Sequence, residues 1–96
     1  MQYVALIPDF EGCSSLTTAP DLLADVLEEG SYGSMFKTCS SLNYIKCLAT
    51  DISARYCIDG WVNGVSATGT FVKDANASSW TTGNDGIPSG WAIINL

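Results

Sequence analysis

The side chains with the greatest chemical potential in this sequence are its four cysteines, Cys13, Cys39, Cys47 and Cys57. A structural zinc site needs closely spaced pairs of Cys or His, and the chain has neither a CxxC pair nor a histidine. An even number of cysteines in a short exported chain can indicate a disulfide framework, and a Cys13–Cys39 bridge is geometrically conceivable. Unpaired cysteine is also among the most buried residue types, so we favour reduced thiols in the core.

Acid–base and nucleophilic chemistry lacks its usual groups in this chain. The absence of histidine removes the commonest general base and both the Ser–His and the Cys–His pairings. Glu28 and Glu29 are adjacent, so they should point to different sides of a helix end and be solvated. Asp74, Asn84 and Asp85 lack the alternating spacing of a calcium loop, which favours a role in turns. We therefore expect no enzymatic activity, no metal and no cofactor.

Length and charge narrow the remaining functions. Ninety-six residues suit one domain, and 47% hydrophobic with 15% charged residues is typical of an ordered chain. The net charge is −6, and the few cations do not cluster, which argues against nucleic acid and anionic membranes. The apolar start has no basic segment and is interrupted by Pro8, so we expect no signal peptide in this chain. No apolar run approaches the ~20 residues that span a bilayer.

A repeated motif predicts how the chain positions its side chains. Residues 13–16, Cys-Ser-Ser-Leu, recur as residues 39–42, an offset of 26 residues. The same offset relates further pairs: Phe10 and Phe36, Leu22 and Leu48, Asp25 and Asp51. A weaker third copy begins at Trp61 and Val62, which align with Met35 and Phe36. A fixed period of this size is typical of stacked repeats.

Each repeat is expected to contribute a short strand and a helical arm. Strands are predicted over residues 16–19, 43–48 and 69–73, with a last one near 92–95. The helical spacing of the apolar residues between 22 and 27 predicts a helical turn or two that ends at Gly30. A second helix is predicted after Asp51, with Ile52, Tyr56 and Trp61 near one stripe. The third unit has no helix after its strand, because its turn residues are too frequent.

These elements predict a single domain over residues 1–96. Residues 1–9 should form an irregular or strand-like segment in which Tyr3, Ala5 and Ile7 alternate. The repeats should occupy residues 10–73, and residues 74–96 should form a turn-rich C-terminal cap. Trp80 and Trp91 are expected to cover the last open face, since terminal repeats need capping.

Equivalent positions in successive repeats should lie one above another. A structural ladder is predicted from six residues: Cys13, Leu16, Cys39, Leu42, Ile45 and Phe71. The outward residues of the strands should form a surface for partner contact: Thr18, Tyr44, Lys46, Thr70 and Val72. Tyr44 is suited to partner contact, because tyrosine supplies area at a low entropic cost. Alternatively, it only covers its neighbours on the sheet.

The composite motif also resembles a known family. Residues 35–42, MFKTCSSL, with their partial copy at residues 10–16, resemble the BspA-like leucine-rich repeats of gut and oral bacteria. The segments NYIKCLATDIS, GTFVK, WTTG and GIPSGW resemble the closing part of such arrays in Bacteroides-type proteins. The resemblance implies an α/β fold, a short right-handed leucine-rich-repeat-like solenoid of two to three 26-residue repeats. It also implies a secreted or cell-surface location.

Our first hypothesis is a non-enzymatic protein that mediates protein–protein or host and cell-surface interaction, such as adhesion. One alternative is a carbohydrate-binding module that stacks sugar rings on Trp61, Trp80 and Trp91, although packing in the core or cap is favoured for these rings. Another is a structural cap or assembly fragment of a longer repeat protein. Such a fragment would form homo-oligomers through an uncapped N-terminal repeat face. The partner stays open between a protein and a glycan.

Overall fold

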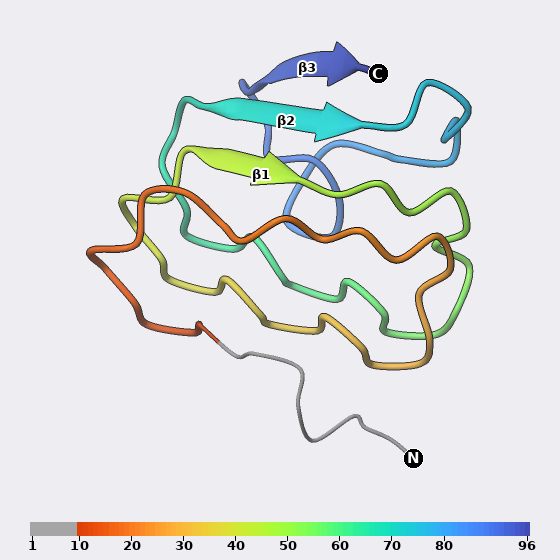
Figure 1. The fold of residues 1–96 in the computed structure, drawn as a ribbon. Helices are drawn as coiled ribbons and strands as arrows, with labels where there is room; N and C mark the ends of the chain where they lie inside the picture. The colour runs from red at the N-terminus through yellow and green to blue at the C-terminus, as the bar shows by residue number, and fades with distance from the viewer. Residues whose placement is uncertain (1–9) are drawn as a thin grey trace.

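The computed structural model describes residues 10–96, which form a small compact domain built on a three-stranded parallel sheet (Figure 1). The strands are β1 (Tyr44–Lys46), β2 (Thr70–Lys73) and β3 (Ala92–Asn95), in the order β1-β2-β3. Parallel neighbouring strands need a long crossover connection. The chain therefore leaves the sheet after each strand and returns to the end at which that strand began before it forms the next strand. The predicted strand-like segment with Tyr3, Ala5 and Ile7 lies outside the described residues.

Residues 10–96 contain no helix, so the predicted helical arms are wrong. Between residues 22 and 27 the chain is extended, and Leu22 and Val26 form isolated parallel bridges to Cys47 and Asp51. The Leu27 N–H donates to the Asp51 carbonyl at 3.0 Å, which is a bond to the next coil of the chain. A helix would need that N–H for a carbonyl four residues earlier. The stacked neighbour therefore takes the hydrogen bonds that a helix would use. None of the described residues forms a helix that could cross a membrane.

Runs of consecutive turns over residues 28–39 and 54–65 replace the helices. In the first run the N–H groups of Ser31, Met35 and Cys39 each donate to the carbonyl three residues earlier. The third residue of each turn has a positive φ, which a type II turn requires: Gly30, Ser34 and Thr38. The second run places positive φ at the equivalent positions 26 residues later: Tyr56, Gly60 and Gly64. The four-residue spacing of these positions is incompatible with a continuous α-helix.

The two runs of turns are joined by a ladder of hydrogen bonds. Alternate N–H groups of the first run, those of residues 30, 32, 34, 36 and 38, donate to the carbonyls of residues 55, 57, 59, 61 and 63 over 2.7–3.1 Å. Every bond joins residues 25 positions apart. In Figure 1 the two stepped traces, gold-yellow and green, run side by side beneath the sheet. The chain is thus a stack of coils that are hydrogen-bonded on two sides.

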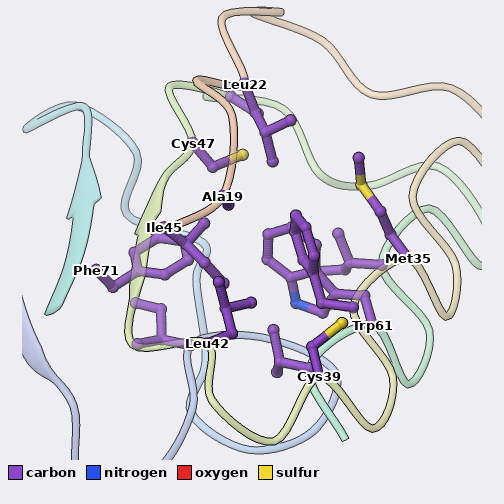
Figure 2. Close-up of a cluster of buried hydrophobic side chains, with 14 of the residues drawn as sticks. Ala19, Leu22, Met35, Cys39, Leu42, Ile45, Cys47, Trp61 and Phe71 are labelled. Atoms are coloured by element: carbon purple, nitrogen blue, oxygen red, sulfur yellow. The ribbon is translucent and has the colours of Figure 1, made fainter. Parts of the chain in front are cut away.

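The core lies between the sheet and the runs of turns. Figure 2 shows side chains from both layers gathered around Trp61. A column of rings passes through the coils, with centroids 5.8 Å apart between Phe10 and Phe36, between Phe36 and Trp61, and between Trp61 and Trp80. Since each ring comes from a different coil or from the C-terminal segment, the column ties the stack together.

The residues of the predicted ladder have different burial. Cys39, Leu42, Ile45 and Phe71 are wholly buried, and Leu16 is half-buried against the core. Cys13 is exposed, because it lies in the first described coil while Cys39 lies between two coils and donates its Sγ–H to the Phe10 carbonyl. The three cysteines after Cys13 are all buried. The predicted core position therefore holds for three of the four, and their reduced state stays a prediction.

The C-terminal segment closes the last coil with side chains as well as backbone. The Gly60 N–H donates to Asp85 Oδ1 at 2.6 Å, and the Val62 N–H donates to the Asn84 carbonyl. The Trp61 Nε1–H donates to the Gly86 carbonyl at 2.8 Å. One short loop thus supplies the hydrogen-bond acceptors that a further run of turns would otherwise provide for the last coil. β3 then extends the sheet as an exposed edge strand.

Candidate functional site: the outer face of the sheet

Three of the predicted contact residues form one row across the sheet. Thr18 forms a parallel bridge to Tyr44, Tyr44 pairs with Thr70, and Thr70 pairs with Ala92. Residues in register on neighbouring strands point to the same face. The row therefore places Thr18, Tyr44 and Thr70 side by side, at the 26-residue step that the sequence repeat predicts.

This row lines an open hollow of about 540 Å³. Asn43, Thr68 and Gly69 complete its wall. Within residues 10–96, no charged side chain lines the hollow, so its polar groups are hydroxyls, an amide and the backbone. A side chain at Gly69 would meet the Asn43 carbonyl at 2.6 Å and the Trp91 ring at 2.7 Å. Glycine at this position therefore lets the coil after residue 67 pass close beneath the row.

A second row runs parallel to the first and includes the other two predicted residues. Lys46 pairs with Val72, and Val72 pairs with Ile94. Val72 is only 4% exposed, so it packs between its neighbours and offers no contact area. Lys46 is half-buried, and Ile94 is 48% exposed. Sequence reasoning missed Ile94, because the step from β2 to β3 is 22 residues rather than 26 and the repeat offset does not reach it.

Two of the three tryptophans that the carbohydrate alternative used are buried. Trp61 and Trp91 are buried, and Trp80 is half-buried. Each indole N–H donates to a backbone carbonyl: Trp61 to Gly86, Trp80 to Ala49, and Trp91 to Ser66. A buried indole that is fixed by a backbone hydrogen bond contributes to packing and cannot stack on a sugar ring. The rings of Trp61 and Trp91 therefore pack in the core and against the C-terminal segment.

The buried thiols are poor nucleophiles in these surroundings. Burial raises the pKa of Cys47 to about 11, and burial also raises the pKa of Cys57. Because the thiolate is the reactive form, both groups are protonated and inert at neutral pH. Among the described residues, no group of three or more Cys, Asp or Glu side chains is placed to hold a metal ion.

The arrangement is therefore a polar, shallow surface suited to contact. Tyr44 supplies the largest side chain of the first row, and hydroxyl groups flank it on both neighbouring coils. Comparison of the chain with protein-family models, with curated proteins and with solved structures finds no match.

Proposed function

We propose that the chain is a short right-handed leucine-rich-repeat-like solenoid, of the BspA-like kind, that binds a protein partner at a cell or host surface without catalysis. The observation that carries the proposal is the in-register row of Thr18, Tyr44 and Thr70 above an uncharged hollow. Stacked-repeat proteins use the repeated outward positions of neighbouring coils as their binding surface. In place of helical arms, the proposed solenoid has runs of turns.

The composition of the row favours a protein partner. Tyrosine is enriched at the centres of protein interfaces, where its ring buries area and its hydroxyl keeps a hydrogen bond. The threonine hydroxyls beside it can both donate and accept. The exposed Ile94 adds apolar area on the neighbouring row. Self-association through the N-terminal repeat face stays a separate prediction.

Site-specific photo-crosslinking tests this face directly. A benzophenone amino acid replaces Tyr44 in one variant and Asn63, an exposed residue in the second run of turns, in a matched control. Both are exposed to surface-protein extracts of epithelial cells. We expect a discrete adduct from position 44 alone, and loss of that adduct when Thr18 and Thr70 are also changed to Glu. Equal adduct yields from the two positions would contradict the proposal.

Once an adduct is identified, its affinity can be measured. The Tyr44→Ala variant should bind the purified partner at least ten-fold more weakly, as expected for a central interface tyrosine worth about 2 kcal/mol. The Asn63→Ala variant should bind as the unaltered chain does.

A further inference from the structure

A second hollow lies on a different part of the molecule. It is an open groove of about 620 Å³ between residues 50–59 and the C-terminal segment, which contributes Ser79, Thr81 and Asp85. Its lining combines apolar side chains such as Ile52 and Ile58 with hydroxyl groups. Its volume lies in the range of small-molecule sites, about 300–1,000 Å³. None of the residues that line the hollow on the sheet lines this groove.

Tyr56 places an aromatic ring at this groove although the backbone of this residue has a strained φ. Its side chain is 61% exposed and its φ is 60°. A bulky residue is disfavoured in this region, and the equivalent position in the preceding coil is Gly30. Burial does not compensate for the strained φ, because most of the ring is in solvent. The ring is therefore exposed to solvent and contributes little to the packing of the core.

A neighbouring cation fixes the orientation of the ring. The Arg55 guanidinium carbon lies over the Tyr56 ring, 5.8 Å from its centroid. Arg55 itself is not among the residues that line the groove. The position that a cationic ligand would take on the ring is thus filled by the chain itself. Since the Tyr56 side chain is 61% exposed, the rest of the ring is left for a flat, apolar surface.

Carboxylates line the groove near the ring and are held in place by the backbone. Asp51 Oδ1 accepts hydrogen bonds from the Ser53 N–H and Oγ–H, and Asp85 Oδ1 accepts one from the Gly60 N–H. The bonds from Ser53 lower the pKa of Asp51, so this side chain is ionised at neutral pH. Each carboxylate keeps its second oxygen as an acceptor. Within residues 10–96, no Lys or Arg lines the groove.

We propose that this groove binds a neutral saccharide, with one sugar ring stacked on Tyr56 and its hydroxyl groups donating to the carboxylates of Asp51, Asp59 and Asp85. A sugar ring has an apolar face and a rim of donors, which matches the aromatic ring and the acceptors that surround it. Acidic sugars are disfavoured, because three carboxylates line the groove and the chain carries a net charge of −6. The inference goes beyond the protein contact proposed for the sheet.

Amide chemical shifts of the labelled protein test the ligand class. The probes are the neutral oligosaccharides cellohexaose, xylohexaose and mannohexaose, with hexagalacturonate as the acidic control and hexalysine as the basic one. We expect saturable shifts, confined to residues 50–59 and 79–85, with at least one neutral sugar and none with hexagalacturonate. No shift with any neutral sugar would overturn the proposal. A saturable shift with hexalysine alone would replace the saccharide with a basic peptide.

A substitution separates loss of the ring from loss of the fold. Tyr56→Gly removes the ring and also relieves the positive φ, so the variant should fold with an equal or higher Tm. Its affinity for the sugar should fall at least ten-fold. The matched control, Ser34→Gly, relieves a positive φ outside the groove and should keep the affinity within two-fold. Unchanged affinity in Tyr56→Gly would overturn the assignment, whatever happens at Tyr44.

Discussion

Cys47 is a titratable residue whose surroundings differ strongly from water. Its side chain is wholly buried. Its backbone forms a parallel bridge to Leu22 of the preceding coil, and its N–H donates to the Val72 carbonyl of the following one. Burial raises its pKa from 9.0 to about 11, and the nearby Cys57 adds to the rise. Because the unfolded chain loses the thiol proton first, the folded state holds more protons at alkaline pH.

The pH dependence of unfolding should show this difference. The contribution of Cys47 is complete below about pH 9 and is lost as the pH rises toward 11, an effect on the order of 2 kcal/mol. Urea unfolding of the chain between pH 8 and pH 11 should therefore give a falling free energy of unfolding. In Cys47→Ala, which has no such proton, the fall should be shallower. Parallel curves for the two proteins would show that Cys47 titrates normally in the folded state.

The residues of the two candidate sites can be predicted from the sequence to different degrees. Thr18, Tyr44 and Thr70 follow from the 26-residue offset, because equivalent positions of stacked coils share a face. The alternation of side chains along the strand predicts that Val72 faces outward. In the structure it lies in register between Lys46 and Ile94 and is buried. Tyr56 was assigned to a helical stripe with Trp61. In the run of turns, Trp61 is buried while Tyr56 points to solvent.

At the scale of elements, the runs of turns define this fold as much as the sheet does. Their hydrogen bonds are of two kinds, one closing each turn and one reaching the next coil. The turns require a positive φ at every fourth residue, which only glycine adopts without strain. Glycine occupies this position at 12, 30, 60 and 64, and Ser34, Thr38 and Tyr56 occupy the others.

Two alanine substitutions should separate the conformational and steric requirements of these turns. At Gly30, φ is +68° and no described atom lies within 4 Å of an added Cβ. Gly30→Ala should therefore lower the free energy of unfolding by about 1 kcal/mol, the conformational cost alone. At Gly64, φ is +88° and the Cβ would lie 3.2 Å from Thr38 Cα. Gly64→Ala should cost at least about 1 kcal/mol more, because two packed coils must separate.

Denaturant midpoints at constant m-value measure both costs. Equal losses for the two variants would mean that the coils are not in close contact at Gly64, and would contradict the stacked arrangement.

The prediction of helices is wrong for a physical reason that can be found in the sequence. Leu22, Val26 and Leu27 have the spacing of one face of a helix. A chain that is not helical can bury residues at the same spacing when it is stacked against another coil and bends irregularly. In the structure Leu22 and Leu27 are buried while Leu23 and Val26 are exposed. The four-residue spacing of Gly60 and Gly64 was a usable signal. It repeats at the small residues Ser34 and Thr38, which are 26 positions earlier.

At the scale of the whole molecule, stability comes from contacts between coils. The hydrogen-bond ladders, the column of rings and the parallel sheet all join residues that are at least 19 positions apart. A single coil could not bury Phe36 or Trp61 alone. The repeat in the sequence was enough to predict this stacking, because identical residues at a fixed offset must meet similar neighbours. The 22-residue final step was not predictable from that offset.

The stacking register is the central claim, because it builds both the core and the row on the sheet. Nuclear magnetic resonance of the labelled protein measures it directly. We expect contacts that link Thr18 to Tyr44 and Tyr44 to Thr70, and a coupling through the hydrogen bond from the Phe36 nitrogen to the Trp61 carbonyl carbon. Helical contacts between residues three and four apart over residues 22–27 or 54–61, without these inter-coil signals, would contradict the account.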